Sequence, residues 1–197
     1  MFQDFVVGQI LNVEQTKSVV SKENLVPGNI PYVTRTAFAN GYSGTCGNTD
    51  KLNRGNCITI GAETGVAFYQ PNDFVAGNKV YRISRDGLGE EEYLYLVACL
   101  NKKACDYSYS NARIPEKIKV ELISLPVTSD GTPDWDYMRE RIEEMERERI
   151  EELDAYLKVT GLNDYVLTEE DKKVLSLSLQ NPHLTKMGLW KMIAEMR

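Results

Sequence analysis

The feature that most constrains the fold is a charged stretch with a single apolar stripe, running from Asp134 to about Val159. Its apolar side chains recur at steps of 3, 4, 3, 5, 3 and 4 residues, and they are Trp135, Met138, Ile142, Met145, Ile150, Leu153 and Leu157. This spacing keeps the side chains on one face of a helix. We therefore predict one helix, about 40 Å long at about 1.5 Å per residue.

Such a helix has a solvated back and an apolar face that needs a partner surface. The partner could be the chain's own domain, but we favour a second helix, and hence a homodimer through these seven residues. The five-residue step breaks a strict heptad, so a long regular coiled coil is not expected. Thr132 is the expected N-cap, with Pro133 at the first helical position, where its missing N–H costs nothing.

Residues 1–126 have a different pattern, made of short runs rich in β-branched and aromatic residues. We predict strands in these runs, at 4–15, 30–35, 56–61, 65–70, 78–84 and 118–126. Gly61 and Gly65 lie between two of the runs and predict a hairpin. A helix is predicted at 90–103, where acidic residues come first and lysines last, as suits the helix dipole.

The chain is therefore predicted to be α+β and to have three parts. A strand-rich domain at 1–127 is followed by the helical arm at 128–160 and by a helical tail at 161–197. In the tail, Thr168 begins a capping-box-like Thr-Glu-Glu-Asp, and we expect the short helix after it to end near Gln180. A last amphipathic segment is expected to follow, with Leu184, Met187, Trp190 and Ile193 on one side.

The acidic balance of the chain belongs to its C-terminal part. The formal net charge is −6; residues 1–126 hold 13 basic and 13 acidic residues, whereas residues 127–197 hold 10 and 16. A neutral domain can still bind DNA if its basic residues share one face, because phosphates are neutralised locally. Composition alone leaves open the alternative that these charges are scattered for solubility.

Cysteine usage and hydropathy predict a cytoplasmic protein. The four cysteines, at 46, 57, 99 and 105, match no paired zinc-binding spacing, and His183 is the single histidine. The N-terminus has neither the basic region nor the cleavage site of a signal peptide, and no run of about 18 apolar residues could span a membrane. Free thiols in a reducing cytosol are expected, with no metal site and no membrane contact.

No signature of catalysis is found in the sequence. It lacks both the Asn/Asp-Pro-Pro-aromatic motif of adenine methyltransferases and a phosphate-binding GxxxxGK[ST] loop. A metal-dependent nuclease site could be assembled from Asp134, Glu170 and Lys172, but the aspartate would then begin a helix instead of ending a strand. We therefore expect no catalytic residue in this chain.

Four stretches, taken in order, resemble the target recognition domain of type I restriction–modification specificity subunits. They are FVVGQILNVEQTKS (5–18), GNIPYVTRTAFANGYSG (28–44), residues 53–83 and residues 112–127. The long helix occupies the position of the family's conserved helical region. The similarity covers about residues 2–170, and the order and spacing of the segments carry it, because no single motif is specific.

The resemblance implies a subunit that chooses the DNA sequence and catalyses nothing. Complete subunits of the family usually carry two recognition domains and two helical spacers, and this chain has room for one of each. It could be a natural half-subunit that pairs with a copy of itself and reads a symmetric bipartite site, or a fragment of a longer chain.

The resemblance also implies partners. In this family two methyltransferase subunits use S-adenosylmethionine to methylate adenine N6, and an ATP-driven translocase–nuclease subunit cuts unmodified DNA. We therefore expect the chain to bind double-stranded DNA, adenine methyltransferase subunits and a restriction subunit. S-adenosylmethionine, ATP and Mg²⁺ are expected only on those partner subunits.

Reading a DNA sequence requires polar side chains on loops held by a rigid scaffold, because such side chains reach base edges. Two segments fit, at 34–42 after a strand end and at 107–113 after the predicted helix. The expected DNA contacts are Thr34, Arg35, Thr36, Asn40, Tyr42, Arg54, Asn78, Lys79, Tyr107, Tyr109, Ser110, Asn111 and Arg113. Three of them, Arg54, Asn78 and Lys79, are expected on phosphates, which accept from any donor.

Two alternatives stay open at this point. Each candidate contact could belong to an ordinary surface loop. The whole chain could instead be an acidic helical protein-binding or DNA-mimicking regulator, with the arm as its working surface. The charge of residues 127–197 favours the regulator, whereas the polar loops and the family-like domain argue against it.

Overall fold

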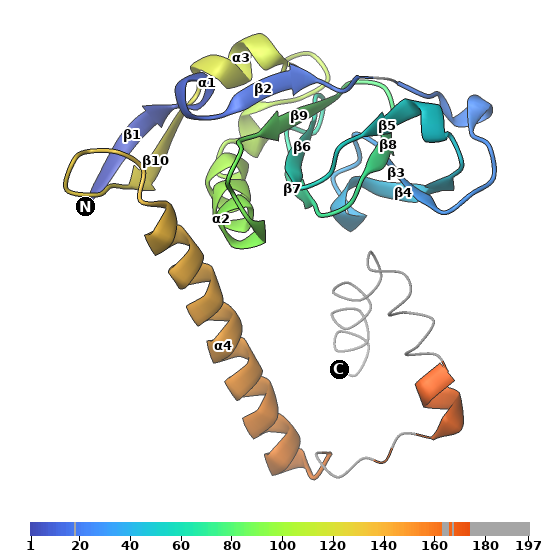
Figure 1. Cartoon of the computed structure of the whole chain (residues 1–197), viewed down its shortest axis with the longest axis vertical. Coiled ribbons are helices and arrows are strands. Elements are labelled where there is room, and N and C mark those ends of the chain that lie inside the picture. The colour runs from blue at the N-terminus through green and yellow to red at the C-terminus, as the bar shows by residue number, and fades with distance from the viewer. Residues whose placement is uncertain (18, 163–165, 167, 174–197) are drawn as a thin grey trace. The chain divides into compact units, whose positions relative to one another are not determined.

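The structure is a computed structural model that describes residues 1–17, 19–162, 166 and 168–173. The chain divides into two compact units, Met1–Glu146 and Arg147–Arg197. All the strands of the described residues lie in the first unit (Figure 1).

The strands form one two-stranded and two four-stranded sheets. They are β1 (Phe2–Val6), β2 (Asn12–Gln15), β3 (Ile30–Val33), β4 (Tyr42–Cys46), β5 (Leu52–Asn53), β6 (Cys57–Gly61), β7 (Ala67–Gln70), β8 (Phe74–Ala76), β9 (Val80–Ser84) and β10 (Leu122–Pro126). The sheet orders are β1-β10, β2-β9-β6-β7 and β4-β3-β8-β5. Only the β3–β8 pair is parallel among these strands.

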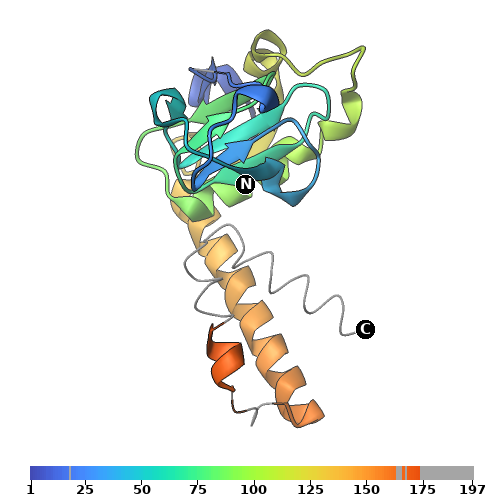
Figure 2. The same ribbon diagram turned by 90° about the vertical axis from the view of Figure 1, so that its right-hand side faces the viewer.

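Of the described α-helices, α2 and α4 are long, and α1 and α3 are short. The α-helices are α1 (Val7–Ile10), α2 (Glu90–Asn101), α3 (Pro115–Val120) and α4 (Trp135–Thr160). Short 3₁₀ turns occur at η1 (Lys22–Asn24), η2 (Ala39–Gly41), η3 (Thr49–Lys51) and η4 (Ala104–Asp106). Figure 2 shows α4 as one unbroken helix.

The β2-β9-β6-β7 sheet is the middle layer of the first unit. Because side chains alternate along a strand, its two faces bury different residues. On one face, Ile58 and Ile60 of β6 belong to a core that includes Leu96 of α2. On the other face, Cys57 packs in a smaller core with Phe74 of the β4-β3-β8-β5 sheet. In Figure 1 the second four-stranded sheet therefore lies at one end of the unit, and β1 and β10 lie at the other.

A buried ion pair ties the ends of several elements together. Nη2 of Arg113 lies 2.5 Å from Oε2 of Glu121, and both side chains are almost fully buried. Arg113 also donates to the carbonyl oxygens of Gly65 and Leu100, and its backbone N–H donates to Ala62. The charge is thus compensated, and each of the three guanidinium nitrogens has at least one acceptor.

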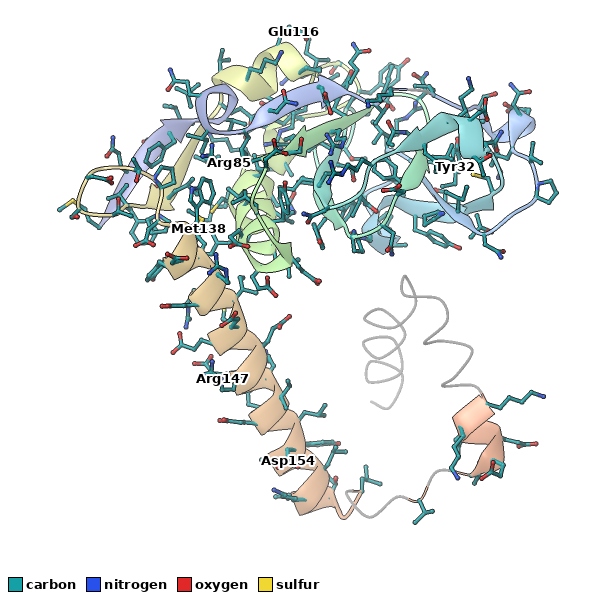
Figure 3. The ribbon with its side chains drawn as sticks, viewed as in Figure 1. Tyr32, Arg85, Glu116, Met138, Arg147 and Asp154 are labelled. Carbon is teal, nitrogen blue, oxygen red and sulfur yellow. The ribbon has the colours of Figure 1, made fainter. Side chains whose placement is uncertain are left out.

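Three contacts fix the first turns of α4 on the rest of the first unit. Met138 is fully buried in the main core (Figure 3), and the guanidinium of Arg85 lies 5.2 Å from the ring centroid of Trp135. Arg139 donates from Nε and Nη2 to one carboxylate oxygen of the buried Glu92. The other oxygen of Glu92 accepts from the backbone N–H of Gly89, at the start of α2. The beginning of α4 is therefore held by packing and by charge.

Several sequence predictions are confirmed. The fold is α+β, and α4 spans nearly the predicted range. The helix at 90–103 is present as α2, and β6 and β7 form an antiparallel hairpin. In the second unit, Thr168 and Asp171 exchange the hydrogen bonds of a capping box. The predictions at Gln180, Leu184, Met187, Trp190 and Ile193 lie outside the described residues.

Three local predictions are wrong. Asp134, rather than Thr132, caps α4, because its Oδ1 accepts from the N–H of Tyr137 while the hydroxyl of Thr132 is used in the preceding turn. Pro133 therefore lies before the cap, in a bridge with Val127, and not at the first helical position. Residues 118–120 are helical, since Pro115 opens α3 at a first-turn position where proline is favoured.

The run at 4–15 is not one strand either, because α1 interrupts it. Val7 donates its N–H to the carbonyl of Glu121, which draws this segment onto α3. Gly8 permits the approach, since a Cβ there would lie 2.8 Å from the carbonyl oxygen of Lys119.

The buried pair leads to a prediction about stability. Arg113→Met should lower the free energy of unfolding by about 3–5 kcal/mol, because it leaves the Glu121 carboxylate buried without its partner. Urea titration followed by circular dichroism measures the change. The matched control is Arg149→Met, which breaks an exposed Arg–Glu pair on α4 and should leave the domain's midpoint nearly unchanged. Equal midpoints for the two variants would contradict the assigned role of Arg113.

Candidate nucleic-acid interface

The first predicted loop joins β3 to β4 and is held by its own backbone. Thr34 donates its N–H to Gly41 at 2.8 Å, which closes the loop. Ala39 and Asn40 have φ angles of 53° and 55°, a left-handed conformation that asparagine tolerates better than most residues. The side chain of Asn40 donates to the carbonyl of Tyr69 in β7. The loop is thus attached to the middle sheet at fixed points.

Two basic side chains converge on the hairpin turn between β6 and β7. Nε of Arg35 lies 2.9 Å from one carboxylate oxygen of Glu63, and Nζ of Lys79 lies 2.9 Å from the other. The hydrogen bond from Lys79 lowers the pKa of Glu63, with the charge of Arg35 acting in the same direction, so the carboxylate is ionised at neutral pH. The same hydrogen bond raises the pKa of Lys79.

The second predicted loop reaches the same place. Tyr109 is 80% exposed, and Nζ of Lys79 lies 5.4 Å from its ring centroid. Gly65 lets the loop approach the hairpin, because its φ is 67° and a Cβ would lie 2.8 Å from the carbonyl of Ala104. The structure therefore brings Arg35, Lys79 and Tyr109 together around Glu63.

Arg113 is a correction to the expected DNA contacts. Its side chain has no exposed surface and is used on Glu121 and on two carbonyl oxygens. The guanidinium supports the 107–113 loop from inside and does not face solvent. Tyr107 has a related role, since its hydroxyl donates to Glu121, and burial, followed by that hydrogen bond, raises the pKa of Tyr107 to about 12.

The other polar residues of the two loops are exposed or half-buried. Ser110 and Asn111 are exposed; Ser110 shares a hydrogen bond with Ser108, and Asn111 accepts from Lys117. In the first loop, Thr34 shares a hydrogen bond with Ser43, and Thr36 accepts from the N–H of Phe38.

Two further candidates flank these loops and one lies apart from them. Tyr42 is half-buried at the start of β4, and Asn78 is exposed in the turn beside Lys79. Arg54, in contrast, lines a polar cleft of about 330 Å³. Arg82 donates to the backbone carbonyl of Arg54 there, and the structure does not bring Arg54 into the Glu63 cluster.

Sequence reasoning missed two residues of this region. Only its position in the predicted hairpin turn could have marked Glu63 as a functional residue, because a single glutamate forms no recognisable sequence motif. Phe38 is 78% exposed at the tip of the first loop, beside the two left-handed residues. An aromatic residue between turn-forming neighbours is a weak signal, because the sequence does not reveal which way its ring faces.

The described residues contain no candidate metal site. No three or more His, Cys, Asp or Glu side chains within the described ranges are grouped so that they could hold a metal ion. Burial raises the pKa of the Cys57 thiol to about 11, and Cys105 is the exposed one of the four free cysteines. None of the described helices is both long enough and apolar enough to cross a membrane.

Comparison with known proteins decides what this arrangement belongs to. Residues 1–155 match the family model described as Type I restriction modification DNA specificity domain. The chain belongs to this family. The match covers the whole strand-rich part, both predicted loops and most of α4, and it confirms the resemblance found in the sequence.

A curated member of the specificity-subunit group is similar over part of its length. It is the specificity subunit S.BcgI of the type II restriction enzyme BgcI from Heyndrickxia coagulans, 26% identical over 135 residues, which are 66% of this chain and 40% of that protein. The specificity domain described here therefore spans less than half the length of this curated relative.

Two solved structures share the fold. The HsdS subunit from Thermoanaerobacter tengcongensis matches with a TM-score of 0.52 and 15% identity, over 94% of this chain and 44% of that one. The type I restriction–modification S subunit from M. genitalium matches with a TM-score of 0.51 and 14% identity, over 80% and 43% of the two chains. At these identities the likeness shows the fold of the specificity domain.

The two basic residues should differ in the kind of DNA affinity that they contribute. Arg35→Ala should cost about 1–3 kcal/mol on the preferred duplex and change the base preference at one position, if its guanidinium reads a guanine. Lys79→Ala should weaken binding to all sequences alike and lower the salt slope by about one unit, as for a phosphate contact. Lys79 has a φ of 58°, a left-handed conformation that is strained for a residue with a Cβ. Alanine is therefore the substitution to use, because it keeps this strain unchanged, whereas glycine would remove it and alter stability as well.

Titrations of preferred and scrambled duplexes at several salt concentrations measure both effects. Equal loss on the two duplexes for Arg35→Ala would reject its base-reading role. A loss confined to the preferred duplex for Lys79→Ala would reject its phosphate role.

Proposed function

We propose that this chain is the sequence-reading component of a type I restriction–modification complex and that it reads one half of a bipartite DNA target. One observation carries the proposal: the two polar loops of a DNA specificity domain meet at one place, with Arg35, Lys79 and Tyr109 around Glu63. Thr34, Thr36, Asn40, Tyr42, Asn78, Ser110 and Asn111 flank these groups and complete the proposed DNA contacts.

In this proposal the chain performs no chemistry itself. It recruits adenine methyltransferase subunits, which bind S-adenosylmethionine, and a restriction subunit, which uses ATP and Mg²⁺. Residues 1–127 contact DNA and residues 128–160 serve as the arm for docking. The complex acts in the cytoplasm, where its duplex substrate lies.

Co-purification with a methyltransferase subunit from the same cells tests this function against the acidic-regulator alternative. We expect the tagged chain to retain the methyltransferase subunit and, with it, to shift one selected duplex more strongly than a scrambled one. A DNA mimic would instead bind a DNA-binding protein and compete with duplex for it. If the complex bound every duplex equally, the proposed specificity role would be lost.

The arm supplies a separate part of the proposal, the homodimer. Met138 is not available for a partner, because it is fully buried in the chain's own domain; this corrects its assignment to the dimer face, whereas Trp135 is half-buried against the same core. Farther along α4, Met145 is 46% and Ile150 67% exposed, while Ile142, Leu153 and Leu157 are half-buried. An apolar row this open to water favours a second copy as its cover.

Solution mass tests the dimer directly. The chain, of 22.3 kDa, should elute with twice that mass in light-scattering measurements, and Ile150→Glu should return it to the single-chain mass. A charge buried against a partner helix without compensation is costly, so the glutamate should disfavour the dimer. In the single chain Ile150 is exposed, so its replacement should not unfold the domain. Glu148→Gln, on the same helix, is the control that should stay dimeric. A single-chain mass for the unsubstituted protein would contradict the prediction.

A further inference from the structure

One carboxylate holds both basic residues of the proposed DNA contact. The two oxygens of Glu63 are shared between Nε of Arg35 and Nζ of Lys79, each at 2.9 Å. The side chain of Glu63 is 15% exposed, against 41% for Arg35 and 44% for Lys79. The carboxylate therefore lies beneath the two cations, and the cations lie nearer to the solvent.

The same turn also holds the backbones of those two residues. The hydroxyl of Thr64 donates to the carbonyl of Arg35 at 3.1 Å, and the N–H of Ala62 donates to the carbonyl of Lys79 at 3.0 Å. Gly61 is required at this place, because a Cβ would lie 2.8 Å from the Cα of Arg35. Main chain and side chain of both residues are thus located by one hairpin turn.

We propose that Glu63 is a positioning and specificity-determining residue: it aims Arg35 at a base edge and restrains Lys79 from binding phosphates of any sequence. This inference rests on the proposed function, in which Arg35 reads a base and Lys79 contacts the backbone.

The geometry at Arg35 explains the first effect. Nε is the Arg35 nitrogen that lies 2.9 Å from Glu63, and no hydrogen bond from the two terminal nitrogens of this guanidinium is found among the described residues. Those nitrogens form the edge that donates to O6 and N7 of a guanine. Because Glu63 already restricts the rotamers of Arg35, less side-chain entropy is lost when Arg35 binds a base. This gain in affinity is obtained only with a duplex that presents the matching base.

The charge of Glu63 explains the second effect. A phosphate that approaches Lys79 must compete with an ionised carboxylate for the same ammonium group. This cost falls on every sequence equally, whereas the gain from a positioned Arg35 falls on the preferred sequence alone. The positioning of Arg35 therefore raises the ratio of specific to non-specific affinity, which is the quantity that selects one site among many, and the competition at Lys79 lowers the affinity for every duplex without changing that ratio.

Glu63→Gln separates these effects from a change in overall charge. The full chain, with the methyltransferase with which it co-purifies, first selects a preferred duplex from a random-sequence pool. Affinities are then measured for that duplex and for a scrambled one. We expect Glu63→Gln to bind the scrambled duplex more tightly and to lower the preferred-to-scrambled ratio by about tenfold, the scale of one bidentate arginine–guanine contact.

The control is Glu116→Gln, which removes the same charge from an exposed position on α3 (Figure 3). It should change the two affinities by the same small factor and leave their ratio intact. Thermal unfolding of both variants shows whether the fold is kept, and Glu63→Asp, which restores the charge, should recover part of the ratio.

A double-mutant cycle with Arg35→Ala decides whether Glu63 acts through Arg35. With Arg35 removed, Glu63→Gln should no longer lower the ratio, although it should still strengthen binding to the scrambled duplex through Lys79. An unchanged ratio for Glu63→Gln, together with a lowered ratio for Arg35→Ala, would overturn this inference and leave the proposed function standing. If the unsubstituted complex preferred no duplex at all, both would be overturned.

Discussion

The rest of the first unit depends on one buried ion pair. Arg113 and Glu121 are enclosed together, and the hydrogen bonds of Arg113 reach the hairpin after β6 and the end of α2. The backbone of Glu121 also accepts from Val7, at the start of α1. Segments that are far apart in sequence are therefore joined at a single charge centre. A charge centre of this kind is costly to bury, and it is tolerated because the two charges are paired and each nitrogen of the guanidinium has an acceptor.

How much of this could be predicted depended on whether a feature is local. The period of the apolar residues sufficed for α2 and α4, and two glycines between strand-like runs sufficed for the β6–β7 hairpin, because these signals lie in consecutive residues. It failed for α1, where the hydrogen bond from Val7 to the distant Glu121 decided the conformation. It also failed for α3 and for the cap of α4, where Pro115 and Asp134 decided the helix start and the apolar period carries no information about such capping positions.

The candidate interface shows the same division. Arg35, Lys79 and Tyr109 were predictable as polar or aromatic loop residues, and the structure adds that they meet. Arg113 was predicted as a DNA contact by the same loop pattern, yet it is buried because it pairs with the carboxylate of Glu121, eight positions later. Residue type alone cannot distinguish an arginine that faces solvent from one that neutralises a buried partner, because both satisfy the same loop pattern.

The first loop of the interface is attached to the scaffold through carbonyl oxygens at two of its residues. The hydroxyl of Thr64 donates to the carbonyl of Arg35, and the side-chain amide of Gln70 donates to that of Asn40. Every residue type offers a carbonyl oxygen, so these attachments make few demands on the side chains that the loops display. A lineage of such domains can accordingly change its target sequence by small steps, replacing one displayed side chain after another while the frame beneath continues to fold.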